Sequence, residues 1–484
     1  MIKRLLCIAA IALIPGAACA GILLGTLSAS HSTMPPGVTL QAIDGETLTG
    51  TTQSHNYFNR NGFSAAVSMG WDNPSFFPIG PFASDYSSSA SAYAGKTIAQ
   101  VWSDVGWNMM MNINSVDPSL ALTNGVSLID NTQGSAFVGS WPLPYVGLMS
   151  CDEPQQYVGS QQWNCTTVPF TTTANSISDN KFWYFNNTWN WNAGAGISGS
   201  PAPGTPTSNM SALLTTPNAT QRHMDTASVD MYWSSEQQWG FMVGPGGAGT
   251  QVYGIGGGGM TDAQALRGSN YGDMIDIQRV YQTTFPAPIF SVVEDGNPFE
   301  SVSISNWITP PFYNWALWSS VIHGARGLII FDHNFGSGCQ AADNLTSDIC
   351  SGYSSVRSGQ TVSMYNQMKT TQTGIKSLAS VISSPFAIGY ASVSPARYNY
   401  PGSGPYPTAI ASGIDMMSKW DGSNFYIFAT TSYAQTATNI SATFTVAKGT
   451  TATVLNESRS ISIIGGQFTD TFATAATVHI YQIN

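Results

Sequence analysis

"YNWALWSSVIHGARGLIIFDHNF", residues 313–335, combines two elements with different patterns. Residues 313–325 have the length and apolar character of a buried helix, and residues 326–335 form a short apolar run typical of a buried strand. A second such run, "APIFSVVEDG" (287–296), precedes the helix. A strand, a helix and a second strand in this order indicate parallel pairing of the two strands.

The same alternation extends through the first four fifths of the chain. Further helices are predicted at 93–106, 272–285 and 362–382, and further strands at 76–82, 107–114, 125–131, 145–154, 181–189 and 228–235. Eight strands alternating with helices or long loops predict an α/β fold, a closed (β/α)8 TIM barrel. An open doubly wound sheet is the alternative, but no glycine-rich phosphate-binding turn follows the first strand.

After about residue 385 the pattern changes to short β-rich runs without helices between them. These runs are 424–432, 439–447, 451–464 and 476–483. They predict a small C-terminal antiparallel β-sandwich. The expected domains are a signal peptide (1–20), a barrel (21–384, with 21–70 as a leading segment) and the sandwich (385–484).

The composition and the N-terminus indicate an exported protein. Only 9% of the residues are charged, with 26 acidic against 16 basic, which argues against nucleic acid as a partner. "MIKR", an apolar run and Ala18-Cys19-Ala20 form a signal peptide with cleavage near Ala20, and no later run is long enough to span a membrane. A lipoprotein anchored through Cys19 is the alternative. The oligomeric state is not predicted.

Four cysteines remain after cleavage: Cys151, Cys165, Cys339 and Cys350. Their spacing suggests the disulfides 151–165 and 339–350, although four cysteines allow two other pairings. A zinc site is disfavoured because no C-x-x-C motif is present and the six histidines are scattered. We expect no metal and no cofactor.

Acidic pairs follow two of the predicted strands. "VGLMSCDEP" (146–154) ends the fourth strand with Asp152 and Glu153, and the seventh ends with Glu294 and Asp295. Active sites of β/α barrels lie at the carboxyl ends of the strands. Two carboxyl groups on opposite sides of that mouth are what glycoside hydrolysis requires, so a carbohydrate substrate is predicted. The structural alternative for the glutamates is a helix N-terminal or loop-capping role, and for the aspartates a bond to turn N–H groups.

The chain also resembles clan A glycoside hydrolases, most closely uncharacterised secreted bacterial members. The matching stretches are "DNPSFFPIGPF", "VGLMSCDEP", "APIFSVVEDG", "WALWSSVIHGARGLIIFDHNF" and "VLNESRSISIIGGQFTDTFATAATVHIYQI". The resemblance implies Glu153 as acid/base, Glu294 as nucleophile, a retaining mechanism on β-linked glycosides, and Tyr232 as a residue that orients the nucleophile. The clan usually has Asn before the acid/base, where it holds the sugar 2-hydroxyl; Asp152 stands there as a candidate substrate-binding residue, and because of this departure the sugar identity is not predicted.

Aromatic residues form the second group of candidates. Trp189 and Trp191 follow the fifth strand, where flat rings can stack on sugars, although tryptophan is more often part of a core. His333, after the eighth strand, is a candidate for the pocket or for a structural pair. Further candidates are Trp71, Trp141, Trp233, Asp130 and Glu236. The alternative function is a glycan-binding barrel that has lost catalysis.

Overall fold

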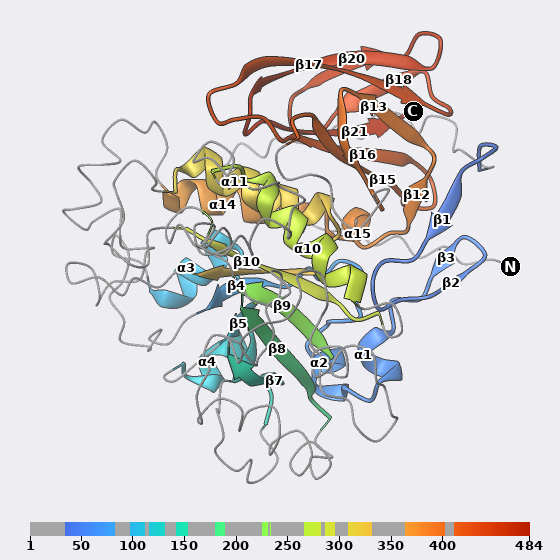
Figure 1. Cartoon of the computed structure of the whole chain (residues 1–484). Coiled ribbons are helices and arrows are strands. Elements are labelled where there is room, and N and C mark those ends of the chain that lie inside the picture. The colour runs from blue at the N-terminus through green and yellow to red at the C-terminus, as the bar shows by residue number, and fades with distance from the viewer. Residues whose placement is uncertain are drawn as a thin grey trace, which may run out of the picture.

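The computed structural model describes residues 34–82, 97–111, 116–130, 142–152, 180–188, 225–230, 233, 266–281, 286–295, 308–331, 364–401 and 411–484. A barrel with helices around it, and antiparallel sheets beyond the helices on one side, make up this part of the chain (Figure 1). Within the described residues, no helix is both long and apolar enough to cross a membrane.

Eight strands close the barrel in the order β10-β11-β4-β5-β6-β7-β8-β9, and all neighbours are parallel. Their bounds are β4 (Ile79–Phe82), β5 (Met109–Met111), β6 (Ser127–Asp130), β7 (Tyr145–Asp152), β8 (Phe182–Thr188), β9 (Thr226–Asp230), β10 (Ile289–Glu294) and β11 (Gly327–Phe331). The predicted barrel is confirmed. The sixth strand begins at Thr226, two residues before the predicted start.

Side chains of the strands alternate between the barrel interior and the helix layer. On β10, Phe290 and Val292 belong to the interior cluster, whereas Ile289 and Val293 pack with the surrounding helices. Ser291 also faces outward, where its hydroxyl accepts a hydrogen bond from Ser320 at 2.8 Å. Because alternation has a period of two, Glu294 faces inward, at the carboxyl end of the strand.

The amino ends of the strands are covered by the segment that carries α1 (Tyr57–Arg60) and α2 (Ser64–Ser68). Trp71 donates from Nε1 to Ser127 Oγ at 2.9 Å and packs on Phe182, and both partners are the first residues of their strands. Only 4% of Trp71 is exposed. The hypothesis that Trp71 stacks on a sugar is therefore wrong: it fills the barrel end opposite the site.

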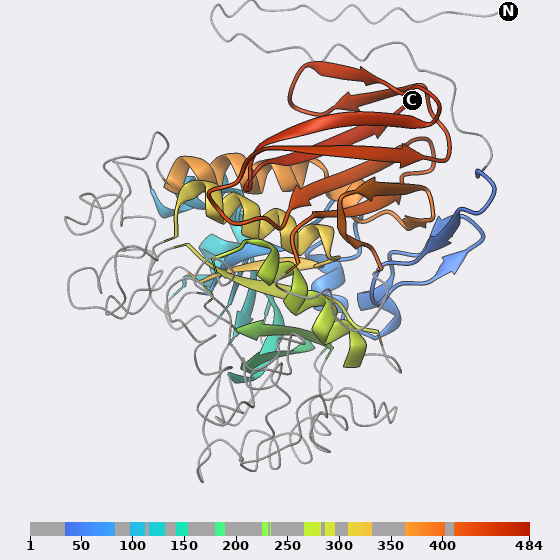
Figure 2. The same ribbon diagram turned by 45° about the horizontal axis from the view of Figure 1, so that its top comes forward.

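The described helices around the barrel are α3 (Ile98–Val105), α4 (Pro118–Thr123), α10 (Ser269–Tyr281), α11 (Pro310–Ile322), α14 (Met364–Ser377) and α15 (Ala379–Ile382). Local signals explain where two of them begin. Thr97 and Gln100 form a reciprocal capping box on α3, and Thr309 caps α11 just before two prolines. Helix α11 is buried on nearly every side because it lies between the barrel and the C-terminal sheets (Figures 1 and 2).

Two glycines inside helices are expected to respond in opposite ways to alanine. A Cβ at Gly272 of α10 would lie 2.4 Å from His323 Cδ2 and 2.5 Å from Ser319 Oγ, whereas nothing lies within 4 Å of one at Gly374 of α14. We expect Gly272→Ala to destabilise the fold by about 1–3 kcal/mol. Gly374→Ala should stabilise it by up to about 1 kcal/mol, because alanine loses less entropy in a helix.

Denaturant unfolding of the two variants measures both effects. Because His323 is bonded on both ring nitrogens, it is not free to move aside. Equal stability changes in the two variants would contradict the close packing of α10 on α11.

The C-terminal region contains two antiparallel sheets, which confirms the predicted fold class. The larger has the order β1-β12-β15-β16-β21-β18-β19, where β1 is Thr39–Gln41 and β14 pairs parallel to β15, and the smaller has the order β13-β17-β20. The strands are β12 (Phe386–Ile388), β13 (Ala391–Ser394), β14 (Ala396–Asn399), β15 (Ile414–Trp420), β16 (Phe425–Thr431), β17 (Thr438–Val446), β18 (Thr451–Val454), β19 (Arg459–Ser462), β20 (Gln467–Thr474) and β21 (Val478–Ile483).

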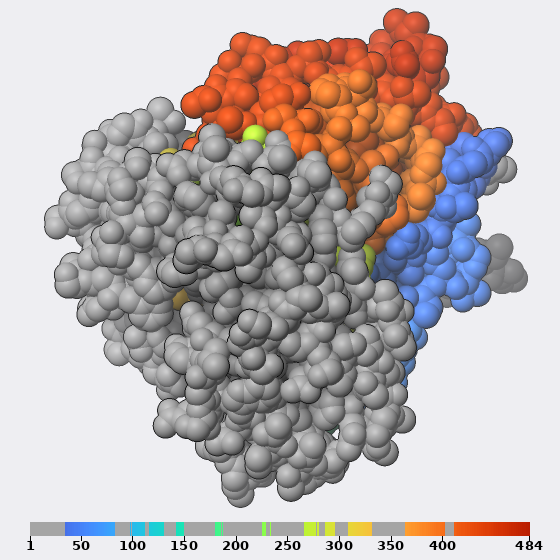
Figure 3. Space-filling view, in the orientation of Figure 1, coloured from blue at the N-terminus to red at the C-terminus, as the bar shows by residue number. Residues whose placement is uncertain are grey.

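The leading segment contributes to the larger of these sheets. Strand β1 (Thr39–Gln41) pairs antiparallel with β12, and the N-terminal segment lies directly against the C-terminal sheets in the space-filling view (Figure 3). The same segment forms a hairpin of β2 (Leu48–Thr49) and β3 (Thr52–Gln53). A domain boundary near residue 385 stays a prediction.

Candidate active site

Glu294 is the last residue of β10 and is completely buried at the carboxyl end of the barrel. The hydroxyl of Tyr271 donates a hydrogen bond to its Oε2. Tyr271 lies in the first turn of α10, and the helix that precedes a barrel strand begins at the end where that strand finishes. The ring of Tyr271 packs edge-on against Phe312, at 6.1 Å between centroids. Its hydrogen bond limits rotation of the Glu294 carboxylate.

One side of the barrel mouth beside Glu294 is aromatic. Phe331, the last residue of β11, is the register partner of Glu294, and its ring stacks on that of Phe82, which ends β4. Both phenylalanines belong to the interior cluster. An apolar wall next to a carboxylate excludes water and strengthens electrostatic interactions at that group.

The other side of the barrel interior is polar. Tyr184 donates from its hydroxyl to Ser228, and Ser228 donates to Asn186 Oδ1 at 2.5 Å. All three side chains are fully buried. Asn186 on β8 is the register partner of Asp152, which ends β7. Hydrogen-bonding groups therefore lie on the strands between β10 and β7.

Asp295, the next residue after Glu294, faces the helix layer. Its backbone N–H donates to Phe331 O at 3.5 Å. Burial and the negative charge of Asp295 raise the pKa of Tyr313, on α11, well above its usual value. Asp295 therefore lies with α11 and not in the barrel interior beside Glu294.

Most of the other predicted site residues lie outside the described residues. These are Glu153, Tyr232, Trp189, Trp191, His333, Cys165, Cys339 and Cys350; for Asp152 and Cys151 the strand is described and the side chains are not. The roles of these residues and both disulfides stay predictions. Trp233 is described and is completely buried.

The strands that carry the two acidic pairs are three steps apart around the barrel. Only β8 and β9 separate β7 from β10 on one side of the barrel, whereas β11, β4, β5 and β6 separate them on the other. In a closed barrel of eight strands the largest possible separation is four steps, so strands three steps apart lie nearly across the mouth from each other, close to the expected arrangement. The strand ends bearing Asp152 and Glu294 share the shorter arc, which is lined by Asn186 and Ser228.

Sequence reasoning missed Tyr271, Asn186 and Ser228. The signal for Asn186 and Ser228 was a polar residue at an inward position of a buried strand, in "FWYFNNT" and "TASVD". Tyr271 has no periodic signal, because its role depends on where the first turn of α10 lies. The resemblance to clan A implied Tyr232 as the residue that orients Glu294, whereas in the structure Tyr271 makes a hydrogen bond to Glu294.

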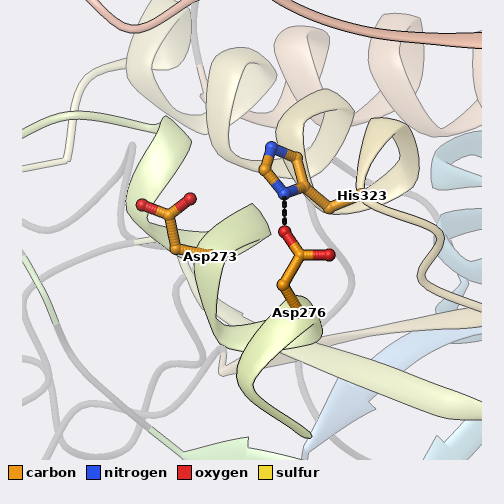
Figure 4. A group of neighbouring side chains, drawn as sticks. All are labelled: Asp273, Asp276 and His323. Atoms are coloured by element: carbon orange, nitrogen blue, oxygen red, sulfur yellow. Dashed lines mark hydrogen bonds and ion pairs between the residues drawn. The ribbon is translucent and has the colours of Figure 1, made fainter. Parts of the chain in front are cut away.

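A second cluster of ionisable groups lies on the far side of α10. Asp273 accepts two bonds from Arg397, at 2.8 and 3.0 Å, and Arg397 also donates two bonds of 2.8 Å to Asp415. His323 Nδ1 bonds to Asp276 at 2.6 Å (Figure 4), and its Nε2 lies 3.4 Å from Asp415. Both side chains of the Arg397–Asp415 pair are completely buried.

Asp273, Asp276 and His323 are also close enough to be considered as metal ligands, since their donor atoms lie within 4.8 Å of one another. Their partners argue against that use. Asp273 is bound by Arg397, and Asp276 by Arg279 and His323. Cationic partners oppose the approach of a metal ion, so this cluster is better described as an ion-pair network.

The network changes the pKa of its members. Burial of His323 favours the neutral form, but Asp276 and Asp415 outweigh burial and raise the pKa of His323 to about 9. Burial raises the pKa of Asp273 to about 6 despite the opposing charge of Arg397. For Asp415, Arg397 and His323 outweigh burial and lower the pKa. At neutral pH His323 is therefore a cation.

No protein-family model and no curated protein matches this chain. Similar solved structures include a GH30 endoxylanase from Clostridium papyrosolvens C71. The two chains are 10% identical, the match covers 81% of this chain and 95% of the endoxylanase, and the TM-score is 0.37. The similar structures also include an alpha-amylase of Anoxybacillus (9%, 85% and 98%, 0.42) and a family 5 glycoside hydrolase from Bacteroides vulgatus (9%, 84% and 90%, 0.42). These likenesses are too distant to assign an activity to this chain.

Proposed function

We propose that the protein is a glycoside hydrolase that retains anomeric configuration and cleaves β-linked glycosides or polysaccharide. The observation that carries the proposal is the placement of Glu294. This glutamate is buried at the carboxyl end of a closed β/α barrel, faces the interior and is held by the hydroxyl of Tyr271. Barrel enzymes place their reacting groups at this end.

The second carboxyl group of the proposed mechanism is Glu153, which directly follows β7. Glu294 attacks the anomeric carbon while Glu153 gives its proton to the departing glycosidic oxygen, so a glycosyl ester forms as the glycosidic bond breaks. Glu153 then takes a proton from water, which attacks the same carbon and releases the Glu294 carboxylate. Tyr271 keeps that carboxylate in one orientation through both steps.

We also propose that the protein is exported, extracellular or periplasmic, after cleavage near Ala20. The support is the sequence "MIKR", the apolar run behind it and Ala18-Cys19-Ala20. The proposed disulfides, 151–165 and 339–350, fit an oxidising compartment. N-terminal sequencing of the secreted protein tests the cleavage site. The mature chain should begin at Gly21, and any other first residue would contradict the prediction.

Turnover and binding on one substrate panel test the function. The panel contains aryl β-glycosides, aryl α-glycosides and soluble polysaccharides, with a binding assay on the same compounds. We expect hydrolysis of at least one β-linked member, and NMR of the first product formed should show the β-anomer. An α-anomer would contradict the retaining mechanism. Binding of a panel member without any turnover would contradict the enzyme hypothesis and support a glycan-binding barrel.

A further inference from the structure

Helix α10 has two buried faces with different partners. Ser269, Asp273 and Asp276 are three or four residues apart and share one face, which meets the C-terminal sheets. Tyr271 and Ile275 lie on the opposite face, toward the barrel, where Tyr271 reaches Glu294. The helix therefore connects the proposed nucleophile to the C-terminal sheets across its own width.

The contacts on the sheet side run along the length of the helix. Ser269 bonds to Ser432 at 3.2 Å, and Tyr398 donates to Asp276 at 2.8 Å. Between these two contacts, Asp273 is held by both terminal nitrogens of Arg397. At the far end, Arg279 bonds to Asp44 of the leading segment.

Arg397 is the centre of this connection. Its guanidinium, on β14, binds Asp273 of α10 and Asp415 of β15 at the same time, through four bonds of 2.8–3.0 Å. The side chain is completely buried. A planar fork with two bonded edges fixes the rotation as well as the position of its partners, which a lysine ammonium does not.

We propose that Arg397 is a positioning residue for the active site: the C-terminal sheets, through the Arg397–Asp273 pair, hold α10 so that the Tyr271 hydroxyl stays on Glu294. The proposal rests on the function proposed above, because it assigns a catalytic consequence to that hydrogen bond. Tyr271 is two residues from Asp273, about 3 Å along the helix axis, so a small rotation of α10 moves both side chains together.

The test is a set of four proteins: the wild type, Tyr271→Phe, Arg397→Lys and the double variant. On an aryl glycoside that the wild type hydrolyses, we expect Tyr271→Phe to lower kcat about 10-fold or more. Arg397→Lys keeps the charge but loses the fork, and should lower kcat about fivefold or more with KM within about twofold. In the Tyr271→Phe background, Arg397→Lys should have no further effect on kcat.

Arg459→Lys is the matched control. Arg459 also binds an aspartate, Asp470, through two bonds of 2.7 and 3.0 Å, but it lies on β19 and contacts neither α10 nor Glu294 in the structure. Its kcat should equal that of the wild type. The proposal is overturned if Arg397→Lys leaves kcat unchanged, or if its full effect persists in the Tyr271→Phe background.

Amide hydrogen exchange of residues 269–281 gives a readout that does not need activity. Arg397→Lys should speed exchange there about 10-fold or more relative to Arg459→Lys, and unchanged exchange would overturn the proposal. If no substrate is turned over, faster exchange supports the link to α10 while the proposed function fails. If Arg397→Lys does not fold, Tyr398→Phe replaces it, since it loses only the hydroxyl that bonds Asp276 and keeps the ring stacked on His323.

Discussion

Glu294→Gln is expected to lower turnover on the order of 10³-fold or more, with the fold intact. The amide has nearly the shape of the carboxylate and still accepts the hydrogen bond from Tyr271, but it is too weak a nucleophile to form the glycosyl ester. Because the Glu294 side chain is completely buried, the neutral amide does not lose any hydrogen bond to bulk water. Steady-state rates on the best substrate of the panel measure the effect, and thermal unfolding checks the fold.

Two comparisons make the Glu294 result specific. Glu457→Gln changes a partly exposed glutamate on the C-terminal sheets, where its partners are Arg459 and His479, and should retain wild-type turnover. Glu153→Gln should still form the glycosyl ester from aryl glycosides with good leaving groups, because they need little protonation. If Glu294→Gln stayed within tenfold of the wild type, Glu294 would not be the nucleophile.

The second large effect is a loss of stability between pH 6.5 and 9. The pKa of His323 is about 9 in the folded protein against 6.5 for an ordinary histidine, because Asp276 and Asp415 face both ring nitrogens. Because His323 binds its proton more tightly in the folded than in the unfolded protein, protonation stabilises the fold. This contribution is complete below pH 6.5 and is lost as the pH rises through 9. The shift corresponds to roughly 3 kcal/mol. Denaturant unfolding at pH 6 and pH 9.5 measures it.

The other groups near His323 do not produce this trend. Burial raises the pKa of Tyr398, whose ring stacks on His323, well above its usual value. Asp273 has a folded pKa of about 6, raised from 3.8, so its own contribution is already lost as the pH reaches that value. The variant His323→Gln should be less stable at pH 6 and nearly insensitive to pH in this window. A wild type equally stable at both pH values would contradict the charged state of His323.

The barrel could be predicted from the sequence because most of its strands are short apolar runs, and each strand is followed by a helix or a long connection. The same pattern predicted where β7 and β10 end, and therefore that Glu294 lies at the carboxyl end of a barrel strand. Strand β15 gave no comparable signal. All seven of its residues are buried, since one face meets the sandwich core and the other meets the helix layer, so hydrophobic and polar residues do not alternate.

The contacts of Glu294 could not be predicted in the same way. The bond from Tyr271 joins residues on a helix and a strand, and it depends on the rotation of α10 about its axis. On the face of α10 that meets the C-terminal sheets, Asp273 is bound by Arg397, which lies more than 100 positions later in the sequence and also binds Asp415. Sequence patterns are local, whereas this arrangement depends on a buried ion pair between distant segments.

The pairing of β1 with β12 has a consequence for how such a protein can be recombined. Thr39–Gln41 comes before the barrel and Phe386–Ile388 comes after it, yet the two strands are neighbours in one sheet. The barrel is in effect inserted between two pieces of a single sheet. A chimera that replaced only the part after residue 385 would pair β1 with a strand from another protein. The segment with β1 and the part after residue 385 therefore have to be exchanged together.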